Sequence, residues 1–308
     1  MVCLLDISMA QNPNFTLQAS GSVTDFVIDS NLLYAATDQG VVDVFDIKDK
    51  QSTDQIRLPF IKDFMGENIP PKVYSIDKIG DTILLLIQGI HGFRDLILIS
   101  EGSFIKVIDS EKDKMLIKKA RFIDKTKVLL GLLSDELVLF DLKENKIIYR
   151  IQVRSYSFSD FCLNEDHTEV IVADESGVLS LINTENGKLI KEFEGNNVDN
   201  VYQVDYKNDV ILSGGQDRRL GIYKRYIDDP YYIQGDFLIY CVGLSSDGTL
   251  GAYSANEDNG IRIINTGTKE EVKTLKGHKN TLTGIQFISK DEIISSAEDA
   301  LIMFWKIE

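Results

Sequence analysis

Residues 275–306 read LKGHKNTLTGIQFISKDEIISSAEDALIMFWK and contain three apolar runs, within 281–288, 292–297 and 301–306. Polar turns separate these runs. Runs of four to eight apolar and β-branched residues bounded by turn residues are typical of β-strands. The stretch therefore predicts three consecutive short strands.

The ending LIMFWK has six counterparts earlier in the chain. Each closes on a bulky apolar residue, and the closing residues are Phe45, Ile99, Phe140, Ile182, Tyr223, Ile264 and Trp305. They are separated by 54, 41, 42, 41, 41 and 41 residues. A period of about 40 to 45 residues is that of a four-stranded propeller blade. We therefore predict seven blades, with an insertion of about 13 residues in the long first interval.

The first period illustrates the pattern within one blade. It predicts strands at Val23–Ile28, Leu32–Thr37 and Val41–Ile47, followed by an outer strand near Gln55–Ile61. The amphipathic helices of 10 to 15 residues that an α/β barrel or a doubly wound sheet requires have no room in such turns. The sequence therefore predicts an all-β fold, a single seven-bladed β-propeller.

The two ends of the chain predict how the ring closes. The sequence stops just after the third strand of blade seven, whereas the apolar segment Phe15–Ala19 precedes the first strand of blade one. We expect residues 14–20 to supply the missing outer strand of blade seven, because an open blade edge invites unzipping or edge pairing. The propeller domain would then span residues 14–308, with residues 1–13 as an extension or a signal remnant.

The last period resembles a WD40 repeat along its whole length. Gly277-His278, Ser295, Asp299 and Trp305 match the positions that mark this family, although Lys306 replaces its Asp. The resemblance implies that His278, Ser295, Asp299 and Trp305 form a hydrogen-bonded tetrad that ties the strands of one blade together. This role is structural.

Other blades match the WD40 pattern only in part. Asp217 and Asp258 occupy the corresponding turn position in blades five and six, but the first six blades lack both the Gly-His pair and the Trp. Outside the last repeat, the resemblance rests on the period alone.

The charge balance limits the classes of partner. The chain has 308 residues, with 33 Lys and Arg against 48 Asp and Glu, and its formal net charge is −15. A negative surface without a basic block disfavours nucleic acid and anionic membranes. No apolar run approaches the roughly 18 residues that span a bilayer. We expect a monomer that binds no nucleic acid and does not insert into membranes.

Catalytic and metal-binding patterns are weak. The three histidines, His91, His167 and His278, fall in blades two, four and seven, and the sequence contains neither GxSxG nor HExxH. We predict no catalytic residues, no metal and no cofactor. The alternative is a propeller enzyme of the lactonase or quinoprotein type, with a metal or quinone over the central channel.

Two surface segments are candidates for binding a partner. The insertion KDFMGENIPPK (62–72) carries Phe64, Met65 and Ile69 beside a stiff Pro-Pro pair, and exposed apolar groups mark interaction sites. An equally weighted alternative is that this loop folds over a neighbouring blade.

The second candidate is the Arg- and Tyr-rich segment of blade five, with Arg218, Arg219 and Tyr226. Arg and Tyr dominate interface hot spots. The alternative is cross-strand packing, which suits the tyrosines better than the arginine pair. A scaffold that reads acidic or phosphorylated peptide motifs through Arg218 and Arg219 is a further alternative function.

The preferred function is a non-catalytic propeller that binds another protein as an accessory or assembly factor. The chain length, the single Gly-His/Trp repeat and residues 10–29 (AQNPNFTLQASGSVTDFVID) also resemble the NapL-type accessory components of bacterial periplasmic nitrate reductase systems. This resemblance implies nitrate reductase subunits as partners and no catalytic residue or cofactor.

The N-terminus and the cysteines bear on location. Ser8-Met9-Ala10 places small residues at the −3 and −1 positions of an export cleavage site, which predicts a periplasmic protein. The cytoplasm is the alternative, because the short apolar start carries no basic region. Cys162 and Cys241 fall in the first strands of blades four and six, too far apart for a disulfide, so both are predicted to stay reduced.

Overall fold

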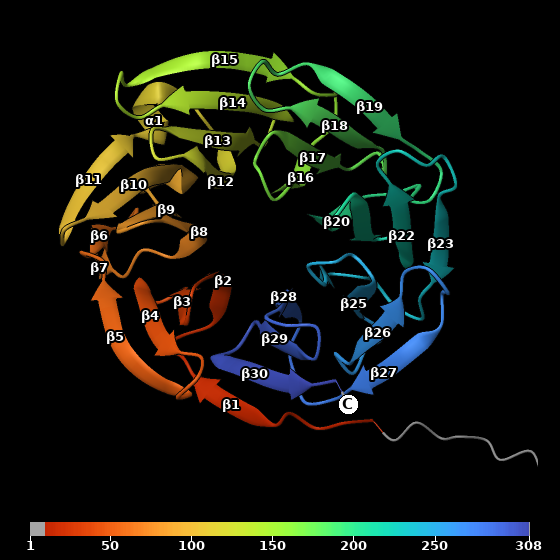
Figure 1. Ribbon diagram of the computed structural model, residues 1–308. Coiled ribbons are helices and arrows are strands. Elements are labelled where there is room, and N and C mark those ends of the chain that lie inside the picture. Colours follow the sequence, from red (N-terminus) through yellow and green to blue (C-terminus); the bar gives the residue numbers. More distant parts are fainter. Residues whose placement is uncertain (1–9, 308) are drawn as a thin grey trace, which may run out of the picture.

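The computed structural model describes residues 10–307 as seven four-stranded antiparallel sheets around one axis (Figure 1). The strands labelled β2, β8, β16, β20 and β28 lie nearest the axis, and β5, β11, β15, β19, β23 and β27 lie at the rim. The predicted all-β, seven-bladed propeller is confirmed. Among the described residues, no helix is long and apolar enough to cross a membrane.

Each blade has its strands in chain order from the axis outward, except the last. Blades one and two are β2 (Val23–Asp29), β3 (Leu32–Thr37), β4 (Val41–Asp46), β5 (Gln51–Arg57), and β8 (Val73–Ile79), β9 (Thr82–Gln88), β10 (Arg94–Ser100), β11 (Ser103–Ile108). Blades three and four are β12 (Ile117–Asp124), β13 (Lys127–Leu132), β14 (Glu136–Asp141), β15 (Lys146–Gln152), and β16 (Phe158–Leu163), β17 (Glu169–Asp174), β18 (Leu179–Asn183), β19 (Leu189–Phe193).

The remaining blades follow the same order. Blades five and six are β20 (Val201–Lys207), β21 (Val210–Gly215), β22 (Arg219–Lys224), β23 (Tyr231–Gln234), and β24 (Val242–Leu244), β25 (Leu250–Ser254), β26 (Ile261–Asn265), β27 (Glu271–Leu275). Blade seven is β28 (Leu282–Phe287), β29 (Glu292–Ala297), β30 (Leu301–Lys306) and β1 (Phe15–Gln18).

One predicted strand is displaced. The outer strand of blade one was expected near Gln55–Ile61, but β5 begins at Gln51. The connection from β4 is a tight turn, in which Lys50 adopts φ of 53° and the Asp49 amide bonds to the Asp46 carboxylate at 2.7 Å. The turn therefore ends sooner than the sequence suggested.

The hydrophobic core lies between neighbouring blades. Middle strands such as β3 and β4 are buried along nearly their whole length, whereas β5 at the rim is largely exposed. Blades pack face to face, so both faces of a middle strand are covered, which explains their uninterrupted apolar sequences.

The ring closes through the N-terminal strand, as predicted. β1 pairs antiparallel with β30, with Leu17 opposite Ile302 (Figure 1). The Asn14 amide donates to the Phe304 carbonyl at 2.8 Å, and the Ala19 amide donates to the Ala300 carbonyl at 2.7 Å. Pairing between the two ends of the chain covers the outer edge of β30 and gives blade seven the four strands that the other blades have.

Residues before β1 also contact the ring. Gln11, within the segment predicted as an extension, forms a parallel bridge with Leu275 of blade six, and its carbonyl accepts the Lys276 amide at 2.8 Å. The propeller's contacts therefore begin at least three residues before Asn14.

In the part of the chain that the structure describes, two short helices and one hairpin interrupt the blades. They are η1 (Ile90–Gly92), α1 (Ser110–Asp113) and the paired strands β6 (Ile61–Lys62) and β7 (Asn68–Ile69). All three lie at the face where the innermost strands begin, which we call the upper face. The innermost strands end at the lower face.

The first prediction concerns closure. Leu17 is buried between blades seven and one with Val23 and Phe304, whereas its neighbour Thr16 is exposed. Leu17→Ala should lower the free energy of unfolding by about 3 kcal/mol, because it removes buried methyl groups and leaves a cavity. Thr16→Ala is the matched control and should change it by less than about 0.5 kcal/mol. Urea titration measures both; equal effects would contradict closure by β1.

Candidate functional site

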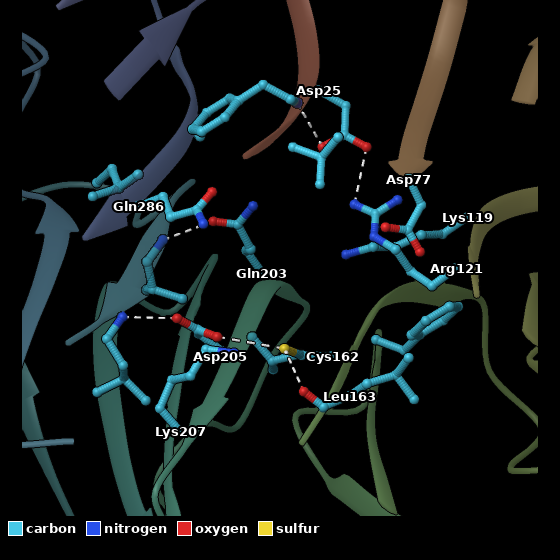
Figure 2. Close-up of a pocket in the computed structure, with 18 of the residues that line it drawn as sticks. Asp25, Asp77, Lys119, Arg121, Cys162, Leu163, Gln203, Asp205, Lys207 and Gln286 are labelled. Carbon is cyan, nitrogen blue, oxygen red and sulfur yellow. Dashed lines mark hydrogen bonds and ion pairs between the residues drawn. The ribbon is translucent and has the colours of Figure 1, made fainter. Parts of the chain in front are cut away.

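The innermost strands enclose a cavity of about 330 Å³ on the propeller axis (Figure 2). Its walls differ in character. Blades six and seven contribute Val242, Leu244 and Ile285, whereas blades one, two, three and five contribute charged side chains. The charged residues that line it are Asp25, Asp77, Lys119, Arg121, Asp205 and Lys207.

Carboxylates of the innermost strands hold the amides of the next blade. The oxygens of Asp25 and Asp77 accept the amides of Ile76 (2.9 Å) and Phe122 (2.7 Å). Asp160 and Asp205 repeat the arrangement in blades four and five.

The Asp160 and Asp205 bonds lead to blades five and six. Asp160 accepts the Val204 amide at 3.1 Å, and Asp205 accepts the Leu244 amide at 2.7 Å. Hydrogen bonds from amides to carboxylates are stronger than neutral ones. These acids therefore join successive blades.

The remaining joints use other groups. Lys119 of blade three reaches Asp160 of blade four at 2.6 Å, and the Thr283 hydroxyl of blade seven donates to the Val23 carbonyl of blade one at 2.9 Å. Between blades six and seven the backbones approach directly. A Cβ on Gly243 would lie 2.5 Å from the Ile285 carbonyl oxygen, so only glycine fits there.

Arg121 is the central cation of the cavity. It donates to Asp25 at 2.9 Å (Figure 2) and to the Ser75 hydroxyl at 2.5 Å, so one side chain spans blades three, two and one. Burial opposes its charge, but the carboxylates of Asp25 and Asp77 prevail and raise the pKa of Arg121. Burial raises the pKa of Asp77, and Arg121 counteracts the shift.

The second prediction tests this role. Arg121→Leu should lower the free energy of unfolding by about 3 kcal/mol, because it leaves two inward carboxylates without their cation. Asp25→Asn in the same background should restore part of the loss by removing one of them. Denaturant titration of the single and double variants measures the coupling. Additive losses would contradict the assigned contact.

The cysteine and histidine near the cavity are engaged locally. The Cys162 thiol lies 3.4 Å from both the Leu163 carbonyl and Asp205, and burial raises its pKa to about 12 (Figure 2). His167 Nδ1 lies 3.0 Å from the Ile123 carbonyl. A thiol with so high a pKa is a poor nucleophile. Cys162 and Cys241 are both free cysteines.

Between residues 10 and 307, no three His, Cys, Asp or Glu side chains cluster so that they could hold an ion.

In blade seven, hydrogen bonds link three of the four residues of the expected tetrad. The Ser295 hydroxyl lies 2.7 Å from His278 Nε2 and accepts the Trp305 indole N–H at 2.8 Å. Burial lowers the pKa of His278 to about 4, although Asp299 opposes the shift, so the imidazole is neutral near pH 7. Asp299 itself accepts from Asn280 at 3.1 Å and from the Leu301 amide at 2.8 Å.

Blade five carries a related brace that the sequence analysis missed. Asn197 stands where blade seven has His278; it accepts from Ser213 at 2.5 Å and donates to Asp217 at 3.2 Å. Tyr223, in the position of Trp305, is buried beside them. Ser213 and Asp217 stand at the positions of Ser295 and Asp299 and could have indicated this brace. It was not recognised because Asn197 replaces the histidine.

A buried acid stands apart at the upper face between blades three and four. Asp135 is fully buried; one of its oxygens accepts the Arg154 amide at 2.9 Å, and the other has no hydrogen-bond partner. Burial, with the nearby Asp174 carboxylate, raises the pKa of Asp135 to about 7.

The third prediction follows from this shift. The folded protein binds the Asp135 proton more tightly than the unfolded chain, so ionisation at this site costs stability as pH rises from about 4 to 7. Asp135→Asn removes that cost. Its melting temperature should exceed that of the wild type by several degrees at pH 8, and the gain should shrink towards pH 4.5. A gain that does not vary with pH would contradict the buried ionisation.

The structure places the first candidate segment on the upper face. Phe64 is 90% exposed and Met65 is 71% exposed at the tip of the β6–β7 hairpin, whereas Ile69 is half-buried and pairs with Ile61. Phe64 and Met65 are therefore not covered by a neighbouring blade, contrary to the alternative in which the loop folds over one.

The second candidate segment is divided between the two faces. Arg218 and Arg219 lie at the upper end of β22, but Tyr226 lies beyond its lower end and is 75% exposed. Arg219 packs on Tyr232 at 4.4 Å from the ring centre and donates to the Asn196 carbonyl at 3.1 Å. The three residues therefore do not form one surface.

Comparison with known proteins agrees with this geometry. The family model described as "WD domain, G-beta repeat" matches residues 269–306, the segment that contains the His278, Ser295 and Trp305 contacts. The last blade is therefore similar to a WD40 repeat, and the chain as a whole is a seven-bladed β-propeller.

Two similar proteins extend the comparison. The WD repeat-containing protein 55 homolog of Dictyostelium discoideum is 21% identical over 233 residues, which are 70% of this chain and 56% of that relative. The chain therefore spans little more than half of that relative's length. The β-propeller domain of Cps50 (Swd1) from Myceliophteria thermophila superposes with a TM-score of 0.75 at 15% identity, covering 97% of this chain and 100% of that one. This likeness shows the fold alone.

Proposed function

We propose that the protein is a non-catalytic scaffold that binds a protein partner through its upper face. WD40 propellers are typically protein-binding scaffolds. The observation that carries the proposal is the β6–β7 hairpin, which holds Phe64 and Met65 largely in solvent. Exposed apolar groups that gather on one surface mark interaction sites.

The hairpin tip is one wall of a groove. Lys62, Asp63 and Phe64 face the turn at residues 88–92 of blade two, and the cavity between them measures about 380 Å³. Ile90 on the opposite wall is 46% exposed. Hydrogen bonds hold the hairpin in shape, because the Asp63 carboxylate accepts the amides of Met65 and Glu67, both at 2.8 Å. A rigid apolar tip loses little entropy on binding.

The contacts inside the charged cavity also support a non-catalytic role. Its carboxylates and cations bond to one another and to backbone amides of neighbouring blades. These groups serve the fold. The alternative, a propeller enzyme with a metal or quinone over the axis, predicts a stoichiometric ion or cofactor in the purified protein.

The narrower form of the proposal names a nitrate reductase system as partner and the periplasm as location. It rests on the resemblance of residues 10–29 to NapL-type accessory components and on the Ser8-Met9-Ala10 pattern. Neither similar protein reported above has a name that mentions nitrate reductase. Ser8 and Met9 lie outside the described residues.

The fourth prediction tests the docking hairpin. Affinity capture from the native organism with tagged wild type should retain a protein partner, and Phe64→Ala/Met65→Ala should reduce that retention at least about tenfold. Ile69 is left intact because it belongs to the hairpin's own pairing. The control is Phe104→Ala/Ile105→Ala. These two apolar residues are also exposed, but they lie on the rim strand β11 of blade two.

Equal retention by both double variants would contradict the docking hairpin. Nitrate reductase subunits among the retained proteins, with an endogenous N-terminus at Gln11, would support the narrower form. Unprocessed protein without those subunits would contradict it.

A further inference from the structure

The upper mouth of the channel is ringed by side chains that come second in their strands. In six blades this residue is Thr24, Tyr74, Lys118, Ser159, Tyr202 or Thr283, and in blade six Tyr240 precedes the strand β24. All seven are partly exposed. The strands that carry them surround the axis in Figure 1.

Most of this ring is occupied by contacts between blades. The Thr24 hydroxyl donates to the Val73 carbonyl at 2.6 Å, and Ser159 donates to Asn200 at 2.7 Å. Tyr202 and Tyr240 stack with ring centres 5.3 Å apart. These residues join neighbouring blades, as the carboxylates do further down the channel.

Lys118 and Arg94 break the pattern. Arg94, at the start of β10, stacks on Tyr74 with its guanidinium carbon 3.8 Å from the ring centre. It donates to the carbonyls of Ile117 (3.4 Å) and Lys118 (3.2 Å). Within residues 10–307, neither cation pairs with a carboxylate, and the Lys118 amine has no hydrogen-bond partner.

The surroundings penalise both charges. Burial, and then the charge of Arg94, lower the pKa of Lys118, and Glu175 only opposes the shift. Burial also lowers the pKa of Arg94, although Tyr74 opposes this. Two like charges held together and partly desolvated destabilise the folded protein unless an anion joins them.

The next two cations on the same strand differ from Lys118. Lys119 and Arg121 follow directly on β12, and each forms an ion pair with an inward carboxylate. The chain carries 15 more acidic than basic side chains, yet none of the described carboxylates forms an ion pair with Lys118 or Arg94. Lys118 and Arg94 lie together at the channel mouth without such a carboxylate, which leaves both available to an anion from outside the chain.

We propose that Lys118 and Arg94 bind a carboxylate of an acidic segment in a partner protein, laid across the tyrosines of the upper mouth. The proposal rests on the proposed protein-binding function and names its chemistry at a second place on the upper face. An anion would face two donors, and the stacked Tyr202 and Tyr240 offer an apolar platform beyond them.

A short acidic peptide fits better than a nucleic acid. Polyanions carry charge along their whole length and would meet the acidic remainder of a chain with net charge −15. Upper turns of blades six and seven, with Glu257, Asp258 and Glu298, would repel such a chain. A few carboxylates placed over Lys118 and Arg94 avoid that repulsion.

The fifth prediction tests the site with defined peptides. The probes are rhodamine-labelled Tyr-Glu-Glu-Glu-Glu-Tyr and the matching Tyr-Gln-Gln-Gln-Gln-Tyr, with binding measured by fluorescence anisotropy at low ionic strength. Wild type should bind the glutamate peptide at least about tenfold more tightly than the glutamine peptide. Lys118→Glu should lower that affinity at least about tenfold.

A matched control separates the site from net charge. Lys143→Glu changes the charge equally at an exposed lower turn of the same blade and should leave the affinity within about twofold. Lys143→Glu should melt at the wild-type temperature, whereas Lys118→Glu should melt at or above it, because the substitution removes a like charge beside Arg94. Absence of binding, no preference for glutamate, or equal losses in both variants would overturn the proposal.

Two further outcomes would reject this site for different reasons. Oligothymidylate that binds more tightly than the glutamate peptide, and loses affinity in Lys118→Glu, would overturn the peptide assignment in favour of nucleic acid. A captured partner that depends on Phe64 and Met65 but is retained fully by Lys118→Glu would keep the proposed function and reject this site.

Discussion

The propeller depends on side chains that bind one blade to the backbone of the next. The innermost strand of each sheet is an edge strand, so half of its amides have no partner within the sheet. Asp25, Asp77, Asp160 and Asp205 supply that partner from the preceding blade. Hydrophobic packing is not directional, whereas these bonds fix the height at which successive blades meet.

This solution places charge inside the ring, and the cations of blade three compensate it. Lys119 and Arg121 occupy the positions where other blades have acids or neutral residues, and they reach Asp160 on one side and Asp25 on the other. Breaking one partner of such a pair costs more than the pair contributes, because the remaining charge is left desolvated. The cavity in Figure 2 is therefore best understood as part of the framework. We assign partner binding to the upper face instead.

The sequence predicted the features that repeat and missed those that depend on contacts between blades. The 41-residue spacing predicted seven blades, and the apolar segment Phe15–Ala19 predicted closure, because both are visible along one chain. The innermost acids looked like ordinary polar residues in strands, since their partners lie about 40 to 50 residues away. Lys118 and Arg94 belong to different blades, so the sequence does not show that they lie together. Arg218, Arg219 and Tyr226 are close in sequence, but Tyr226 lies at the opposite face from the two arginines.

The most direct test of the account is amide hydrogen exchange of the free protein, followed residue by residue by NMR. The account predicts that the amides of Ile76, Phe122, Val204 and Leu244 exchange as slowly as those of middle-strand residues such as Leu85, because each is held by a carboxylate of the preceding blade. Exchange at the rate of unpaired surface amides would show that the carboxylates do not join the blades, and would contradict the account.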